Sequence, residues 1–337
     1  MGSRYVATFV DYLAESYGLR IVVVDRPGIG GSTNVKPSQR ISVWLETVPV
    51  LMRELRADHV SILAHSCGVI YALNTVYAMP QILPPSNPVV YLFSPWVPPR
   101  YSGVKRLLVA SKMPSPLISR LDSVFSFAYR VIAPPANLSS IVVGAISSFF
   151  ASSPAGFSEG CAAGEGDDEQ DDLFRQHMGI SVQEDTARTC ETMRRVWEAD
   201  TRGASGEALL SLRKPQAGSW GVCEEYESCP GKLEERVRGH FCHGRAETCE
   251  AWSASSKAHI ERPHLVISVL WAETDRMIGK DGASYFDKCF KDFSATSGAD
   301  CCLLYRSETV PDTDHESVCL PPYGAFPKVC EEIAAKA

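Results

Sequence analysis

Ser66 lies in a sequence that could carry the nucleophile of an acyl-transfer reaction. Residues 64–68, Ala-His-Ser-Cys-Gly, follow a short apolar run and precede an apolar pattern of helical spacing. They match G-x-S-x-G, a tight strand-to-helix turn that needs small neighbours, with Ala64 in place of the first glycine and Gly68 retained. Such a turn lifts the hydroxyl above the carboxyl edge of a sheet and directs the next backbone N–H at a developing oxyanion. The sequence therefore predicts Ser66 as the nucleophile and Cys67 as an oxyanion donor.

An acid and a histidine follow Ser66 in the chain order that a catalytic triad of this kind requires. Asp275 comes just after the apolar run 265–270, and His315 comes after the run 302–305. Because the carboxyl ends of parallel strands meet at one edge of a sheet, both side chains are expected near the serine. The pattern predicts His315 as the general base and Asp275 as the acid that orients it.

The neighbouring acids and histidines fit these roles less well. Glu273 is the alternative acid, on the same loop as the predicted one. Asp312 and Asp314 are too close to His315 in the sequence and are typical of turn residues. The remaining histidines fall at the wrong ends of predicted strands, within a central insertion or, as His65 does, inside the turn itself.

The elements that must position these residues alternate between buried strands and helices. Short, β-branched, apolar runs are typical of buried parallel strands, and apolar residues of helical spacing separate them. This alternation predicts an α/β fold in which a mostly parallel sheet of about five strands is flanked by helices. The predicted strands are residues 20–25, 59–64, 89–93, 265–270 and 302–305.

A long insertion divides the α/β unit into two parts. The core is expected over residues 1–99 and 263–337, and the mainly helical insertion over residues 100–262. Apolar helices in such an insertion are typical of a lid over an active site, with contact to a membrane surface as the less favoured alternative.

One stretch of the insertion differs from the rest in composition. Residues 158–172 are small and acidic and include no aromatic side chain, so they cannot bury a core and are predicted to form a disordered loop. A helix is expected to begin again near Ser181, with Glu184 as its capping partner.

The overall composition excludes several classes of protein. The 337 residues are 45% hydrophobic and 22% charged, with a net charge of −7, whereas a nucleic-acid-binding domain needs a basic face. No apolar run is long enough to cross a bilayer, and acidic residues interrupt the N-terminal segment where a signal peptide would be apolar. We expect a cytoplasmic protein that acts on a small molecule.

The 12 cysteines are expected to be reduced thiols in that compartment. Cys223, Cys229, Cys242 and Cys249, with His243, resemble a zinc cluster, but their spacing is too wide for a paired-knuckle site. We therefore predict no metal.

Taken together, these motifs resemble those of the α/β-hydrolase fold family. The resemblance rests on Asp25-Arg-Pro-Gly-Ile-Gly-Gly-Ser32, which is similar to the loop after the family's fourth strand, on the turn at Ser66, on Asp275 and on His315. It covers residues 1–98 and 263–337, and the insertion corresponds to the family's variable cap. It implies hydrolysis of an ester, thioester or amide bond through an acyl-serine, without a cofactor.

The resemblance also assigns the surroundings of the nucleophile. The family places its second oxyanion donor on a loop after the third strand, and this chain begins next to the helix that would follow that loop. The backbone N–H of Gly2 or Ser3 is therefore expected to take this role. His65 and Trp96 are expected to contact the substrate.

Three alternative functions can be compared with particular residues of the sequence. A dinucleotide site is disfavoured because Thr33 stands where G-x-G-x-x-G needs its third glycine. Epoxide hydrolases and haloalkane dehalogenases of the family use a carboxylate where this chain has Ser66. A non-catalytic member that binds a ligand under the cap remains open. Aromatic residues of the insertion indicate either an apolar acyl substrate or, more favoured, the insertion's own core: Phe149, Phe150, Trp197, Trp220 and Trp252.

Overall fold

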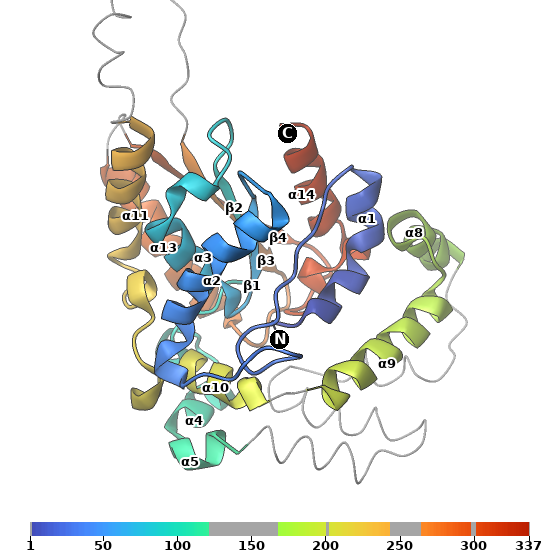
Figure 1. The fold of residues 1–337 in the computed structure, drawn as a ribbon, viewed down its shortest axis with the longest axis horizontal. Helices are drawn as coiled ribbons and strands as arrows, with labels where there is room; N and C mark the ends of the chain where they lie inside the picture. Colours follow the sequence, from blue (N-terminus) through green and yellow to red (C-terminus); the bar gives the residue numbers. More distant parts are fainter. Residues whose placement is uncertain (1, 121–167, 200–201, 243–263, 298–300, 337) are drawn as a thin grey trace, which may run out of the picture.

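The computed structural model describes residues 2–120, 168–199, 202–242, 264–297 and 301–336. Within them, a central sheet is surrounded by helices (Figure 1). The strands are β1 (Ile62–His65), β2 (Val89–Phe93), β3 (Leu265–Ala272) and β4 (Leu303–Val310). The α-helices are α1 (Asp11–Ser16), α2 (Arg40–Leu55), α3 (Gly68–Ala78), α4 (Lys105–Lys112), α5 (Ser115–Ile118), α8 (Asp168–Met178), α9 (Val182–Glu198), α10 (Arg202–Ser211), α11 (Cys229–Val237), α13 (Gly279–Thr296) and α14 (Ala325–Ala334).

The sheet is parallel throughout, in the order β1-β2-β3-β4. Its centre joins distant parts of the chain, because β2 pairs with β3 so that Val90 lies opposite Ile267. Strand β2 is buried along its whole length, which explains its uninterrupted apolar sequence. The carboxyl ends of all four strands therefore meet at one edge of the sheet.

Helices cover both faces of the sheet, and alternate residues of β2 face opposite layers (Figure 1). Val90 and Leu92 pack in the larger cluster, which includes side chains of α3, α11 and α13. Val89, Tyr91 and Phe93 pack in a second cluster with side chains of α1 and α14. The α/β sandwich that the sequence predicted is confirmed.

The predicted first strand, residues 20–25, is not a strand in the structure. None of the described strands pairs with the segment, and Val22 is 44% exposed. A β-branched sequence alone does not make a strand, because the backbone N–H and C=O groups also need a neighbour in register. The described sheet thus has four strands instead of about five.

The described parts of the predicted insertion are helical and contain no strand. Helix α8 lies beside α1, whereas α4, α5 and α10 contribute side chains to the larger cluster, on the other face of the sheet (Figure 1). Helix α9 begins as predicted, since Ser181 and Glu184 form a reciprocal capping box.

The acidic loop predicted over 158–172 differs from the structure at its end. Residues 158–167 lie outside the described residues, but 168–172 form the first turns of α8. Within α8, Asp171 forms an ion pair with Arg175, one turn later. The structure therefore differs from the predicted loop over residues 168–172.

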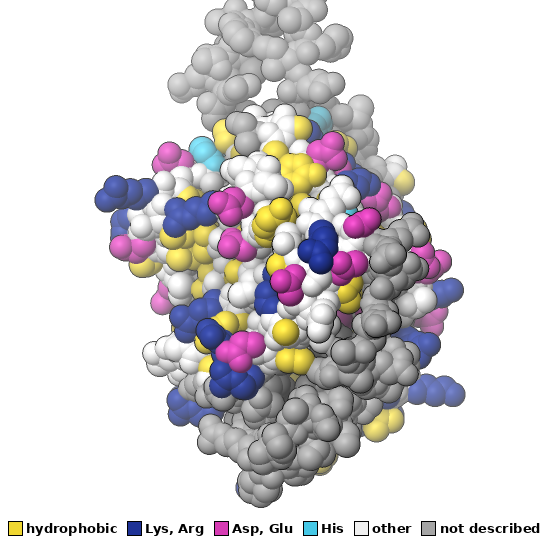
Figure 2. Space-filling model, turned by 90° about the vertical axis from the view of Figure 1, so that its right-hand side faces the viewer, with side chains coloured by type: hydrophobic (Ala, Val, Ile, Leu, Met, Phe, Trp, Pro, Cys, Tyr) yellow, Lys and Arg dark blue, Asp and Glu magenta, His cyan; other side chains and the backbone are white. Residues whose placement is uncertain are grey.

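The surface carries both signs of charge. Figure 2 shows basic and acidic side chains interspersed on one face, with no continuous basic stripe among the coloured side chains. None of the described helices combines the length and apolar character needed to cross a membrane.

Candidate active site

The turn at Ser66 has the backbone geometry of a nucleophile elbow. Ser66 adopts a left-handed φ of +53°, which few non-glycine residues do and which marks a strained position. Its N–H continues the sheet by donating to Phe93 O at 3.0 Å, and its carbonyl accepts from Val69 N at 3.1 Å in the first turn of α3. The serine is thus held between the last bond of β1 and the first of α3.

Small residues on either side make this turn sterically feasible. A Cβ added to Gly68 would lie 3.2 Å from the Cβ of Ala64 and 3.3 Å from Arg26 Nη2. This spacing explains why the pattern tolerates alanine at one position while glycine is retained at the other.

Ser66, His315 and Asp275 form a continuous hydrogen-bonded chain. His315 Nε2 lies 2.9 Å from Ser66 Oγ, and His315 Nδ1 lies 2.8 Å from Asp275 Oδ2. The side chains of His315 and Asp275 are each only 6% exposed. Because a carboxylate can only accept, Nδ1 carries the proton of the neutral ring, which leaves Nε2 free to accept from the serine hydroxyl. The structure brings the three predicted residues together in one hydrogen-bonded chain, and their catalytic roles stay predictions.

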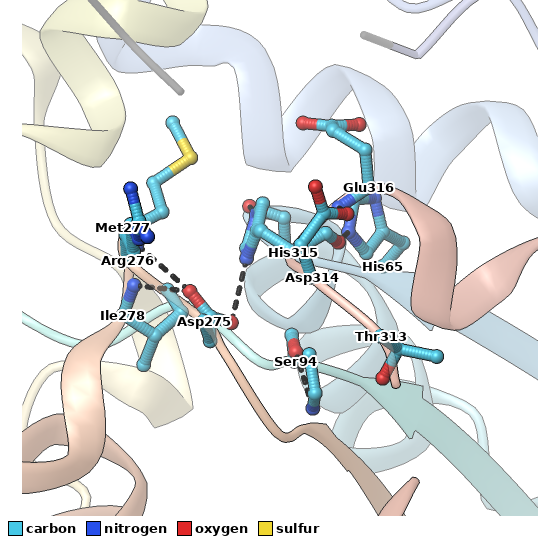
Figure 3. A network of polar contacts seen from close by, with 12 residues as sticks. His65, Ser94, Asp275, Arg276, Met277, Ile278, Thr313, Asp314, His315 and Glu316 are labelled. Atoms are coloured by element: carbon cyan, nitrogen blue, oxygen red, sulfur yellow. Dashed lines mark hydrogen bonds and ion pairs between the residues drawn. The ribbon is translucent and has the colours of Figure 1, made fainter. Parts of the chain in front are cut away.

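Asp275 is held on its other side by the backbone of its own loop (Figure 3). Its Oδ1 accepts hydrogen bonds from the N–H groups of Met277 and Ile278, both at 2.8 Å. The alternative acid, Glu273, instead accepts from the N–H of Asp312 at 2.9 Å and does not join the triad. The geometry therefore distinguishes the two acids that the sequence left open.

Asp275 increases the affinity of the His315 ring for a proton, as the direction of the pKa of each group shows. Burial lowers the pKa of His315, but the hydrogen bond and charge of Asp275 outweigh it, so the net pKa is raised above 6.5. Burial raises the pKa of Asp275, yet the hydrogen bond and charge of His315 and the backbone donors leave it below 3.8. Asp275 is thus ionised wherever the imidazole titrates.

The predicted oxyanion donor, Cys67, lies at the start of α3. Cys67 is the N-cap of α3, and no hydrogen bond among the described residues takes its backbone N–H. Burial raises the pKa of its thiol to about 11, so the side chain is a neutral thiol at pH 7. Gly2 lies beside Arg26, whose backbone N–H donates to Gly2 O at 2.9 Å. Its role as second donor stays a prediction.

The two residues predicted to contact substrate have other partners in the structure. Trp96 is 3% exposed, and its indole N–H donates to Ser211 O at 2.9 Å. His65 Nε2 lies 2.7 Å from the backbone carbonyl oxygen of His315. Substrate contact by either ring stays a prediction, and both rings already join separate parts of the chain.

A buried ionic network beside the turn was missed by the sequence analysis. Glu207 of α10 is bound by Arg26 at 2.8 Å, by Arg40 at 2.7 Å and by the hydroxyl of Tyr71 at 2.6 Å. The Arg26 guanidinium also lies 4.5 Å from the Tyr71 ring centre. These residues come from a loop, two core helices and the insertion, and no short motif could have linked them.

Within the described residues, no group of three or more potential metal ligands lies together. Of the residues that resembled a zinc cluster, Cys223 and Cys229 are buried thiols, whereas Cys249 and His243 lie outside the described residues.

A scan against protein-family models and a search of curated proteins gave no match to this chain. Solved structures with a similar fold include a carboxylesterase of the thaumarchaeon Nitrososphaera gargenis, with 11% identity, a TM-score of 0.44 and coverage of 99% of this chain and 86% of that one. An epoxide hydrolase of Bacillus megaterium has 10% identity, a TM-score of 0.46 and coverage of 100% and 90%. An epoxide hydrolase of the α/β-hydrolase superfamily, from metagenomes of hot environments, has 12% identity, a TM-score of 0.42 and coverage of 98% and 85%.

The chain's own geometry, and not the degree of these similarities, defines its fold. The parallel strand order, the strand-turn-helix at Ser66, and the acid and histidine on the loops after β3 and β4 occur together in one structure. These features together are those of an α/β-hydrolase-like fold.

Proposed function

We propose that this protein is a serine hydrolase that cleaves an ester or thioester bond through an acyl-serine intermediate. The observation that carries the proposal is the 2.9 Å contact between Ser66 Oγ and His315 Nε2, with Asp275 bound to the opposite ring nitrogen. A serine hydroxyl is a weak nucleophile unless a positioned base removes its proton. This geometry supplies the base and also the group that orients it.

In the acylation step, Ser66 Oγ attacks the substrate carbonyl carbon while its proton passes to His315 Nε2. The carbonyl π electrons move to oxygen, and the N–H of Cys67 donates to the resulting oxyanion. When the tetrahedral intermediate collapses, the bond to the leaving group breaks and His315 returns the proton to that alcohol or thiol. Asp275 stays ionised and stabilises the imidazolium in between.

In the deacylation step, water takes the place of the leaving group. His315 accepts a proton from the water as its oxygen attacks the acyl carbon, and it then protonates Ser66 Oγ as the acyl–serine bond breaks. The products are a carboxylic acid and the free serine. No step requires an oxidant, a reductant or a metal.

The nucleophile argues against a second activity named among the similar structures. Two of them are epoxide hydrolases, and the resemblance to the α/β-hydrolase family implies a carboxylate nucleophile for that activity, where this chain has Ser66. An acyl substrate is therefore favoured. A non-catalytic ligand-binding role is the alternative, and the ordered hydrogen bonds through His315 argue against it because binding alone does not require them.

The predicted substrate is a small apolar acyl compound, but the structure does not support every aromatic residue that indicated it. Trp220 is 1% exposed and donates its indole N–H to Leu210 O at 2.7 Å, so it belongs to the core of the insertion. Phe149, Phe150 and Trp252 lie outside the described residues. Chain-length preference must therefore be measured.

The test is hydrolysis of p-nitrophenyl esters and acyl thioesters of graded chain length. Wild type is expected to release the leaving group in an initial burst of one equivalent per protein, followed by steady turnover. Ser66→Ala is expected to lose both the burst and the turnover. Ser42→Ala is the matched control, since Ser42 is an exposed serine at the start of α2. Folded wild type without activity on the series, or Ser66→Ala with full activity, would contradict the proposal.

A further inference from the structure

His65 directly precedes the nucleophile, and its ring is committed to the loop of the catalytic histidine. His65 Nε2 lies 2.7 Å from the backbone oxygen of His315, and the two imidazole rings are 4.8 Å apart at 45°. Figure 3 shows the His65 ring beside the His315 backbone, on the side away from Asp275. His315 is thus bound at two points: Asp275 binds its ring, and His65 binds its backbone oxygen.

The direction of this hydrogen bond follows from the partners. Burial and the neighbouring His315 lower the pKa of His65 to about 4, so its ring is neutral at pH 7. A backbone carbonyl can only accept, so Nε2 must carry the ring proton and donate it. A ring fixed in this tautomer cannot use Nε2 as an acceptor.

The loop that carries His315 is anchored to the ends of two strands, in addition to the hydrogen bonds that form within the loop. Asp312 adopts a left-handed φ of +56°, a conformation that a non-glycine residue adopts at a cost. Thr313 O accepts from the N–H and the hydroxyl of Thr274, both at 2.9 Å, which ties the loop to the end of β3. The bond from His65 ties the same loop to the end of β1.

We propose that His65 is a positioning residue that fixes the distance between the nucleophile and its base. His65 and Ser66 are adjacent on one strained turn, so a bond from His65 to the backbone of His315 links both reacting side chains to a single rigid unit. The inference rests on the proposed function and replaces the expectation that His65 contacts substrate. A misplacement of about 1 Å between reacting groups costs on the order of 100-fold in rate.

The test compares His65→Gln, whose side-chain amide can donate to the same carbonyl, with His65→Ala, which cannot. We expect His65→Ala to lower kcat by about 100-fold with KM little changed. His65→Gln is expected to recover most of that loss. His59→Ala removes an exposed imidazole from the loop before β1 and is expected to leave both constants unchanged.

Two outcomes would overturn the proposal. A rise in KM alone in His65→Ala would show that the ring contacts substrate, and equal kinetics of His65→Gln and His65→Ala would show that the hydrogen bond is not what matters. Thermal unfolding followed by circular dichroism confirms that each variant is folded before its kinetics are compared.

A second readout separates this inference from the proposed function. The proton between His315 Nδ1 and Asp275 should give a low-field NMR resonance, assigned by its loss in His315→Gln. We expect it to persist in His65→Gln and to broaden or disappear in His65→Ala. Persistence in His65→Ala would refute the positioning role even if wild type proved inactive on every ester tested.

Discussion

His315, the proposed base, can accept a proton only while its ring is neutral, and its environment sets the pH at which the ring is neutral. The hydrogen bond and charge of Asp275 outweigh burial and raise the pKa of His315 above 6.5. Activity is therefore expected to fall as the pH decreases through this raised pKa. The measurement is the pH dependence of kcat/KM, whose acidic limb should have its midpoint above pH 6.5.

Removing the charge of the acid should move that limb in a known direction. Asp275→Asn removes the hydrogen bond and charge that raise the pKa of His315 and leaves the burial that lowers it, so the acidic limb should shift to lower pH. The amide also favours the wrong tautomer of the ring, and kcat should fall by about 10⁴-fold.

Glu273→Gln is the matched control for that substitution. Glu273 binds the backbone of Asp312 and makes no contact with the triad, so its variant should keep both the rate and the pH profile. A loss of kcat in Glu273→Gln as large as that in Asp275→Asn would show that Asp275 is wrongly identified as the acid.

At the scale of elements, the joint between β1 and α3 tests how closely the turn at Ser66 is packed. Gly68→Ala places a Cβ 3.2 Å from that of Ala64, and overpacking of this kind costs about 1–3 kcal/mol. We expect lower stability and a lower kcat, because the turn itself must shift. Adding Ala64→Gly should restore both in part, measured as a double-mutant cycle. Additive losses would show that the two methyl groups do not meet.

Glu207 joins the insertion to the core through buried charges. Arg40 is completely buried, and Glu207→Ala would leave its guanidinium without its ionic partner, at a cost of about 3–5 kcal/mol in the free energy of unfolding. Chemical denaturation measures this cost. Glu54→Ala, which removes an exposed partner of Arg53, should change stability by less than about 1 kcal/mol. Equal costs in the two variants would show that the network does not hold the insertion in place.

The elements also show which sequence patterns were informative. Apolar runs located β2 and β3 because these strands are buried on both faces. Strand β4 is longer than its predicted four-residue run, since Arg306 and Glu308 lie within it and find ionic partners in α14. Residues 20–25 had a strand sequence without a strand's neighbour. The local sequence shows apolar periodicity, but it does not show which strand pairs with which.

At the scale of the whole molecule, the positions of the three triad residues were predictable because they follow from the topology of the sheet. Ser66, Asp275 and His315 each follow a strand, and parallel strands bring their carboxyl ends to one edge whatever separates them in sequence. The network at Glu207 was not predictable by that route, because it depends on how α10 of the insertion packs on the core. The same holds for His65, whose partner is a backbone oxygen 250 residues away.

The central claim is that Ser66 is an activated nucleophile, and reaction with a fluorophosphonate probe tests it most directly. The probe phosphonylates a serine, with loss of fluoride, only when a base removes the hydroxyl proton, so it reports the triad without requiring the natural substrate. We expect wild type to be labelled at Ser66, as located by peptide mass spectrometry, and Ser66→Ala to remain unlabelled. A folded wild type that stays unlabelled, or a label on another residue, would contradict the account.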